Sequence, residues 1–315
     1  MEETHTGFFI LQWNAQGLHT HGNELEIFIN DLMAKPSIIC IQETWFTKEK
    51  HMEIKSYKCY PKDRKNGQRG GIAIYVEENI YVSHHEIITY EGIETEIQKL
   101  KCTINGSKLS VINLYNPCKT FTRETLEMIS RNTDENTLIC GDFNSHNALW
   151  GSNKIDKNGR LIEEFLNEKN LILLNDGEPT RLDPSTGKVS CLDLTFSTPR
   201  LATKCTWEAT KHNFGSDHFI LFTQVGYCGT LIKQEESANK LYVTFKKLTK
   251  ENMKLIQMSK SPKIFSLTTH RAHTITLFRN YSTPSNYPSP KPKTEKVPAQ
   301  TKRKTQCRGG TLHVK

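Results

Sequence analysis

The chain has 315 residues, of which 36% are hydrophobic and 24% charged, with a formal net charge of +8. This length allows one large domain or two ordinary ones with a sizeable core. No apolar run approaches the roughly 18 residues that a membrane-spanning helix needs, and residues 8–11 are too few for the core of a signal peptide. We therefore expect an intracellular protein with no membrane partner.

The charge divides the chain into two parts. Residues 229–315 carry 18 Lys and Arg against 4 Glu, a net charge of +14, whereas residues 1–228 carry 24 basic and 30 acidic side chains, a net charge of −6. Residues 281–299 are rich in Ser, Pro and Lys and lack the hydrophobic side chains that a core needs. We predict a folded domain over 1–228 and a basic, largely disordered tail or linker over 229–315, with room for a helix or two in 241–258.

The nine cysteines are odd in number and widely spread, and several lie inside apolar, strand-like runs. They are predicted to be reduced core residues rather than disulfides. No C-x-x-C pair or Cys/His cluster has the spacing of zinc ligands, which argues against a structural zinc site.

The first half of the domain is rich in predicted strands. Residues 8–13 form a strand candidate that ends at Asn14, and residues 23–34 have helical spacing before Pro36. A continuous apolar strand at 37–41 follows and ends at Gln42-Glu43-Thr44. Five strand-like segments then occupy residues 56–115, with hairpin signals at Asn66-Gly67 and Asn105-Gly106.

The second half alternates predicted helices and strands. Residues 122–131 and 158–169 have the apolar stripe of amphipathic helices, and a short strand is predicted at 171–174. Residues 190–196 alternate as a strand, with Asp193 on the face opposite Leu192 and Leu194. A lone acid on a strand is most often a solvated outward residue. These patterns predict a mixed α/β layered domain that ends near residue 227.

The stretch 138–147 contains the most informative pattern. Its apolar run breaks at Gly141 and then presents Asp142 and Asn144 on one face, while Phe143 points the other way, into the core. A carboxylate can accept a proton or hold a cation, and an amide can donate hydrogen bonds to an oxyanion. The pair suits phosphate ester hydrolysis. The structural alternative is an Asx-rich turn in which both side chains bond their own backbone.

Polar side chains recur at the edges of other apolar strands. Hydrolysis of a phosphodiester needs a metal to neutralise charge, a group that positions or deprotonates water, and donors for the phosphoryl oxygens. Carboxylate and amide oxygens suit Mg²⁺ rather than zinc. Each residue taken singly has a plainer interpretation as a buried amide, a surface acid or a capping His, but eight at strand ends predict a shared site. The set is Asn14, Glu43, Tyr115, Asp142, Asn144, Asp193, Asp217 and His218.

Seven motifs in order give the chain a resemblance to a known family. They are Gln12-Trp13-Asn14, Ile41-Gln42-Glu43-Thr44-Trp45, Leu114-Tyr115-Asn116-Pro117, Gly141-Asp142-Phe143-Asn144-Ser145-His146, Leu149-Trp150-Gly151-Ser152 with Asn158-Gly159-Arg160, Cys191-Leu192-Asp193-Leu194 and Ser216-Asp217-His218. Residues 8–225 resemble the endonuclease/exonuclease/phosphatase superfamily. Within it, they are similar to the apurinic-endonuclease-like domain of non-LTR retrotransposons, especially jockey-type elements.

The resemblance implies a four-layer α/β/β/α sandwich, two packed mixed sheets flanked by helices, with one site at a rim. It implies Glu43 as the principal ligand of Mg²⁺, or alternatively Mn²⁺, with Asn14 and Asp217 nearby. Asp142 would orient or deprotonate water or protonate the leaving oxygen. The phosphate would be contacted by Asn144 and Tyr115. His218, oriented by Asp193, would stabilise the transition state.

Two local features qualify this expectation. Neighbours such as Asp217 and His218 face opposite ways in a regular strand, so the backbone after Gly215 must turn for both to serve one site. Repair enzymes of the superfamily carry a second Asp where this chain has Gln16, which puts tight metal binding and abasic-site activity in doubt.

In the family such a domain nicks genomic DNA to prime reverse transcription, so the implied partner is target DNA. The basic tail would bind element RNA, no obligate protein partner is expected, and the nucleus is the expected place of action. The polymerase motif Tyr or Phe-x-Asp-Asp does not occur in the chain, which suggests a truncated or frame-shifted element or an incomplete gene model. The competing functions are a phosphomonoesterase or phospholipid hydrolase on the same fold, and an inactive relic.

Overall fold

A computed structural model describes residues 7–64, 69–89, 91–226, 265–268 and 274–277. The predicted tail, with its helix at 241–258 and its Pro-rich segment at 281–299, falls almost wholly outside these residues, as does the Asn66-Gly67 turn. Of residues 229–315, the structure describes one antiparallel pair of strands, β15 (Phe265–Thr268) and β16 (Thr274–Leu277). The predicted boundary at 228 and the nature of the tail therefore stay predictions.

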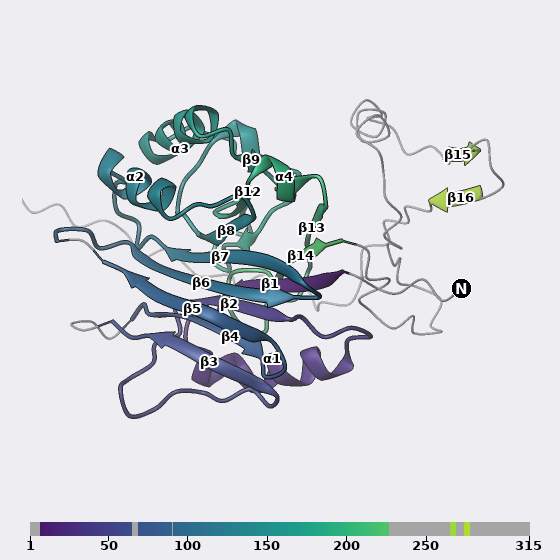
Figure 1. The fold of residues 1–315 in the computed structure, drawn as a ribbon. Coiled ribbons are helices and arrows are strands. Elements are labelled where there is room, and N and C mark those ends of the chain that lie inside the picture. The colour runs from purple at the N-terminus through teal and green to yellow at the C-terminus, as the bar shows by residue number, and fades with distance from the viewer. Residues whose placement is uncertain (1–6, 65–68, 90, 227–264, 269–273, 278–315) are drawn as a thin grey trace, which may run out of the picture. The chain divides into compact units, whose positions relative to one another are not determined.

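Two six-stranded sheets form the centre of the domain (Figure 1). The first has the order β13-β14-β1-β2-β4-β3, and the second has the order β5-β6-β7-β8-β12-β9. The strands of the first sheet are β1 (Phe8–Asn14), β2 (Ile38–Gln42), β3 (Tyr57–Lys62), β4 (Ile72–Glu77), β13 (Cys205–Ala209) and β14 (Leu221–Val225). The strands of the second are β5 (Tyr81–Ile88), β6 (Glu96–Ile104), β7 (Ser107–Tyr115), β8 (Thr137–Asp142), β9 (Ile172–Leu173) and β12 (Asp193–Ser197).

Helices cover the outer face of each sheet (Figure 1). Helix α1 packs its buried Leu25 and Ile29 on the first sheet, and α2 and α3 pack on the second through residues such as Leu126 and Phe165. The bounds are α1 (Leu18–Asp31), α2 (Arg123–Arg131), α3 (Lys157–Glu168), α4 (Pro199–Ala202) and the 3₁₀ turn η1 (Ala148–Trp150). The predicted four-layer α/β/β/α sandwich is confirmed. No helix of the described part is long and apolar enough to span a bilayer.

The interface between the two sheets is apolar in one half and polar in the other. Near the start of β1 the contact is apolar and includes Ile10, Leu100 and Val111. Towards the end of β1 hydrogen bonds cross between the sheets instead. Gln42 Nε2 donates to Asn113 Oδ1 at 2.6 Å, and Thr195 Oγ1 donates to Gln12 Oε1 at 3.1 Å. Because a hydrogen bond is directional, this polar seam fixes how one sheet lies on the other.

Sequence patterns located the strands better than the first helix. The two-residue hairpin predicted at Asn105-Gly106 joins β6 to β7, and both residues have positive φ, 49° and 75°. Helix α1, predicted from residue 23, begins at Leu18. Gly17 precedes it in a left-handed conformation with no side-chain cap, and Leu18 is fully buried, so packing rather than a capping signal starts the helix.

In the part of the chain that the structure describes, the cysteines are reduced, as predicted, but one of them lies outside the core. Seven cysteines lie in that part, and all are free thiols. Four of them are buried, Cys59 and Cys205 are half-buried, and Cys118 is exposed because it lies in the loop after β7 rather than in a strand.

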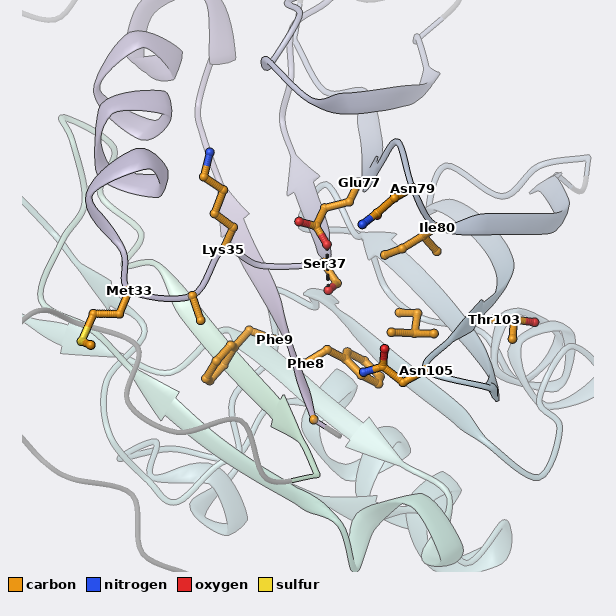
Figure 2. A pocket seen from close by; sticks show the side chains of 13 residues that line it. Phe8, Phe9, Met33, Lys35, Ser37, Glu77, Asn79, Ile80, Thr103 and Asn105 are labelled. Atoms are coloured by element: carbon orange, nitrogen blue, oxygen red, sulfur yellow. Dashed lines mark hydrogen bonds between the residues drawn. The ribbon is translucent and has the colours of Figure 1, made fainter. Parts of the chain in front are cut away.

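A hollow of about 510 Å³ opens between the sheets at the edge where β1 begins. Figure 2 shows Phe8, Ser37, Glu77 and Asn105 around it. Ser37 Oγ donates to Glu77 Oε2 at 3.1 Å, which satisfies the polar groups at this edge. Since β1 runs from Phe8 here to Asn14 at the opposite edge, this hollow lies away from the predicted site.

Candidate active site

The ends of four central strands bring the predicted site residues to one edge of the sandwich. Strands β1 and β2 are parallel, so Asn14 and Gln42 lie side by side at their carboxyl ends. Strands β7 and β8 are parallel as well, and Tyr115 is paired with Asp142. Asp193 begins the antiparallel β12 opposite Asp142. Each sheet therefore supplies part of the site.

Asp142 is at the centre of the hydrogen bonds. Its Oδ2 accepts from Asn14 Nδ2 at 2.9 Å and from Asn144 Nδ2 at 3.1 Å, and its Oδ1 accepts from the Asn144 backbone N–H at 2.9 Å. Asn144 adopts φ 44°, a turn conformation that asparagine tolerates. Asp142 thus forms the Asx turn of the structural alternative through Oδ1, and the functional role of the pair stays a prediction. Phe143 is 1% exposed and lies in the core, as alternation predicted.

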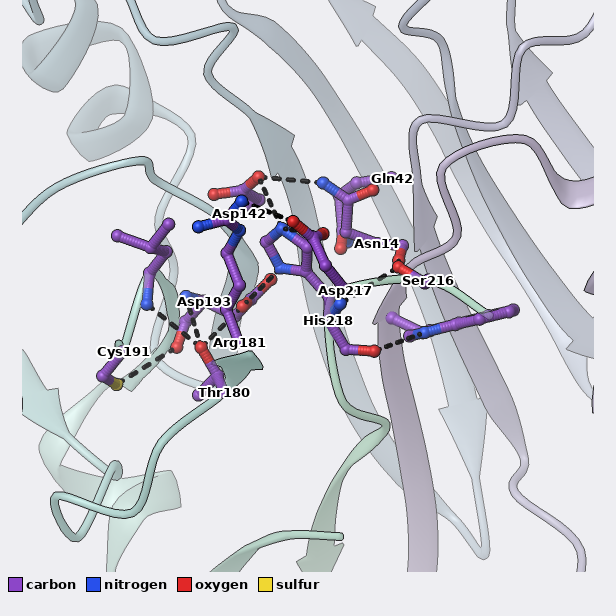
Figure 3. Close-up of polar contacts among 12 residues, drawn as sticks. Asn14, Gln42, Asp142, Thr180, Arg181, Cys191, Asp193, Ser216, Asp217 and His218 are labelled. Carbon is purple, nitrogen blue, oxygen red and sulfur yellow. Dashed lines mark hydrogen bonds and ion pairs between the residues drawn. The ribbon is translucent and has the colours of Figure 1, made fainter. Parts of the chain in front are cut away.

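His218 forms a buried pair with Asp193. Its Nδ1 lies 2.8 Å from Asp193 Oδ2, which also accepts from Thr180 Oγ1 at 2.6 Å (Figure 3). His218 Nε2 lies 3.9 Å from Asp142 Oδ2. Asp193 is 1% exposed, so its interpretation as a solvated strand residue is wrong. The face opposite Leu192 and Leu194 meets the other sheet rather than water.

The backbone after Gly215 turns, as a shared site for Asp217 and His218 requires. Gly215 has φ 89°, and the Ser216 N–H donates to the Asn213 carbonyl. Ser216 Oγ then donates to the Asn14 carbonyl at 2.7 Å, which ties this turn to the end of β1. As a result, Asp217 Oδ1 lies 3.4 Å from His218 Nε2.

Glu43 follows β2 in a left-handed conformation with φ 51°. Asn14 Nδ2 donates to its Oε1 at 3.1 Å, and Trp45 Nε1 donates to its Oε2 at 3.1 Å. Burial, and then the negative charges of Glu43 and Asp142, raise the pKa of Tyr115. Asn14 therefore joins the two carboxylates of Glu43 and Asp142, one from each half of the sandwich.

The site perturbs the protonation of its central groups. Burial raises the pKa of Asp142 to about 7, although the positive charge of His218 opposes the shift. Burial would lower the pKa of His218, but the negative charges of Asp193, Asp142 and Asp217 outweigh it and raise the pKa to about 9. Near neutral pH the site thus contains a carboxyl group that exchanges protons and an imidazolium that keeps its charge.

The donor set suits a hard cation. The carboxylates of Glu43 and Asp142 both accept from Asn14 Nδ2, whose Oδ1 accepts from the Gln16 N–H, and the buried Oδ1 atoms of Asp193 and Asp217 accept no hydrogen bond among the described residues. The ligand atoms of Asp142, Asp193 and His218 lie within 4.8 Å of one another. However, His218 Nδ1 is engaged by Asp193, and an imidazolium does not ligate a metal, so the oxygen set around Glu43 fits a metal better.

The structure adds residues that the sequence did not indicate. Arg181 Nη2 forms an ion pair with Asp217 Oδ2, and Thr180 supports Asp193. Thr180 precedes β10 (Arg181–Leu182) and Arg181 belongs to it, and β10 forms a two-stranded ribbon with β11 (Val189–Ser190). A strand of two residues has no apolar periodicity, so no signal marked either residue.

Comparison with known proteins agrees with this architecture. A sequence profile described as endonuclease-reverse transcriptase matches residues 109–222. The chain is 26% identical over 175 residues to a protein described as a probable RNA-directed DNA polymerase from transposon BS of Drosophila melanogaster. The match covers 55% of this chain and 19% of that protein. It is 22% identical over 170 residues to the RNA-directed DNA polymerase from mobile element jockey of the same species, covering 53% of this chain and 18% of that protein.

Among solved structures, the endonuclease domain of TRAS1, a telomere-specific non-LTR retrotransposon, matches with a TM-score of 0.55 at 21% identity, covering 70% of this chain and 99% of that domain. The domain thus shares the fold of that endonuclease domain, and its residues 109–222 resemble the endonuclease-reverse transcriptase family. In sequence, the likeness is to proteins described as RNA-directed DNA polymerases of the transposon BS and of the mobile element jockey, as the motifs suggested. The matched segments are less than a fifth of the length of those two relatives.

Proposed function

We propose that the domain is a metal-dependent endonuclease that hydrolyses phosphodiester bonds of DNA, with Mg²⁺ as its ion and Mn²⁺ as an alternative. The observation that carries the proposal is the buried relay from Asn14 through Asp142 to His218 and Asp193, at one rim of an endonuclease-type fold. The relatives in which such segments occur are described as RNA-directed DNA polymerases of mobile elements, which supports DNA as the substrate.

Asp142 is the proposed proton acceptor for the attacking water. With a pKa near 7 it is partly ionised at neutral pH, so it can take a proton and pass it on to the leaving oxygen. The backbone N–H and Nδ2 of Asn144 hold its carboxylate in place. The same Asn144 amide and the Tyr115 hydroxyl lie beside it and are proposed to contact the phosphate.

His218 is the proposed stabiliser of the transition state. Asp193 bonds its Nδ1 and maintains its positive charge, which leaves Nε2 directed at Asp142 and the reacting phosphate. A fixed cation in a site closed to water stabilises the charge that develops on the phosphoryl oxygens. Glu43, with Asn14 and Asp217 nearby, would hold the metal, which when bound neutralises phosphate charge.

We further propose that the nick leaves a 3′-hydroxyl that primes reverse transcription in the nucleus, and that residues 229–315 bind nucleic acid, including element RNA. The basis is the retrotransposon likeness together with the +14 charge of that segment.

A plasmid-nicking assay with and without Mg²⁺ tests the central proposal. Glu43→Ala and Asp142→Ala should each lose on the order of 10²-fold or more in nicking rate while the fold persists, because both lie at strand ends. Glu168→Ala, which breaks a surface pair with Arg123 on the outer helices, is the control.

Full activity in either site variant removes that residue from the mechanism. Phosphate release from small esters or lipid headgroups without nicking would favour a phosphomonoesterase or phospholipid hydrolase, and no activity on any substrate would indicate a relic.

A further inference from the structure

The proposed site is crowded with negative charge, although its proposed substrate is an anion. The carboxylates of Asp142, Asp193 and Asp217 lie within ion-pair distance of one His218 ring. Two cations pair with this group, His218 and Arg181. His218 is 3% exposed, whereas the Arg181 side chain is 30% exposed. Arg181 is therefore the one of these two cations that a ligand in solvent can reach.

The backbone, rather than chance side-chain contact, places Arg181 at the site. Arg181 forms an antiparallel bridge with His218. The next N–H along, from Leu182, donates to the Asp217 carbonyl at 2.8 Å, and the Phe219 N–H donates to the Thr180 carbonyl at 2.8 Å. Because the segment pairs on both sides of Arg181, its Cα is held beside the catalytic turn. Figure 3 shows the Arg181 side chain with its partner Asp217.

Asp217 pairs with the Arg181 guanidinium, but that guanidinium is not its only cationic partner. Its Oδ2 pairs with Arg181, while its Oδ1 lies 3.4 Å from His218 Nε2. If Arg181 turned to another anion, His218 would still compensate the Asp217 charge. An arginine presents five N–H donors in a planar fork that matches two oxygens of a phosphate. Arg181 can therefore exchange the Asp217 carboxylate for a phosphate, because each anion would still have a cationic partner.

Other basic groups lie on the same side of the site. His146 Nδ1 lies 3.4 Å from Ser152 Oγ, and the pKa of His146 is lowered first by burial and then by the positive charges of Lys154 and Arg181. Ser152 Oγ donates to the Cys191 carbonyl at 3.4 Å, which links the loop of His146 and Lys154 to the end of the β10–β11 ribbon. A basic rim thus borders the acidic centre.

We propose that Arg181 is the substrate-phosphate-binding residue of this rim, and that its guanidinium moves from Asp217 to a DNA phosphate when the duplex binds. The inference rests on the proposed function and adds the contact by which a domain with a net charge of −6 holds an anionic substrate. Arg181 is ready for this role because Asp217 orients it before DNA arrives.

The test is binding of a short duplex by the full chain in the presence of a chelator, across a salt series. Arg181→Met should weaken binding roughly tenfold or more at low salt, and it should reduce the logarithmic salt slope by about 0.9, the value for one phosphate contact. Arg181→Lys should keep the slope and lose part of the affinity, because a point charge replaces the fork. Arg200→Met is the matched control, since Arg200 pairs with Glu135 on the surface beyond the far end of β12.

A second variant covers the case in which Arg181→Met does not fold. Asp217→Asn removes the competing carboxylate charge and should tighten DNA binding without metal. The inference is overturned if Arg181→Met binds DNA with the same salt slope as the wild type, or if Asp217→Asn leaves DNA binding unchanged. Arg181 would then only neutralise the charge of Asp217. Nicking by the wild type measured in parallel separates the two proposals, because a chain that binds through Arg181 but never nicks refutes the endonuclease alone.

Discussion

Replacing Asp193 by asparagine tests whether the buried pair sets the charge of His218. The asparagine side chain would keep the size of the original and an oxygen for Thr180, but it would remove the negative charge that lies 2.8 Å from His218 Nδ1. Burial alone lowers the pKa of a histidine, and Asp193 is the first of the carboxylates that raise it to about 9. We therefore expect the His218 pKa in Asp193→Asn to fall to its ordinary value or below.

The size of the effect follows from the two pKa values. At pH 8 a group with a pKa of about 9 is about 90% protonated, whereas one at about 6.5 is about 3% protonated, a difference of about 30-fold in imidazolium. A raised folded-state pKa also means that His218 stabilises the fold fully below about pH 6.5 and that this contribution is lost as pH rises through about 9. The difference between the two pKa values corresponds to about 3 kcal/mol.

The assay is a titration of ring-labelled histidine by NMR, with His218 identified by its loss in His218→Gln. Nicking rates measured from about pH 7.5 to about 9.5 give an independent readout. The wild type should lose activity as pH passes about 9, and Asp193→Asn should already have lost it at about pH 8. A His218 resonance that titrates near 9 in both proteins would refute the reasoning, because some other group would then hold the proton.

Three further predictions concern the fold and the tail. Gly141→Ala should lower the melting temperature, since an added Cβ would lie 1.9 Å from the Leu114 carbonyl oxygen; unchanged stability would contradict the tight approach of β7 and β8. Reductant should leave the melting temperature unchanged, because the seven described cysteines are free; a clear loss would reveal a disulfide. Removal of residues 229–315 should flatten the salt dependence of duplex binding. That last prediction is wrong if residues 1–228 fail to fold alone or bind with the slope of the full chain.

Local patterns predicted the framework because strands carry their own signals. Alternation placed Phe143 in the core, and the Asn105-Gly106 pair marked a two-residue turn. A glycine followed by Asp142 and Asn144 marked a strand end with polar side chains, and the parallel pairing of β7 with β8 then brings Tyr115 beside Asp142. These features depend on residues that are close together in the sequence, so a single sequence is enough to predict them.

Contacts that depend on tertiary packing could not be predicted in the same way. Alternation gave the face of Asp193 but not what covers it, which is Thr180 and His218. Arg181 acts through Asp217, 36 positions along the chain, and lies in a two-residue strand with no pattern of its own. The start of α1 depends on the burial of Leu18 rather than on a cap.

The placement of β14 has a consequence for when activity can arise during synthesis. β1, the first strand made, has β2 on one side and β14 on the other, with Phe8 paired to Val225. Trp13 Nε1 donates to the His218 carbonyl and Ser216 Oγ to the Asn14 carbonyl, so one side of the N-terminal strand is completed by residues translated some 200 positions later. A nascent chain that has not emerged past His218 lacks the imidazolium and half the support of Asn14. Such a chain lacks a group of the proposed mechanism, and the polar rim is complete only once β14 and the turn before it have joined β1.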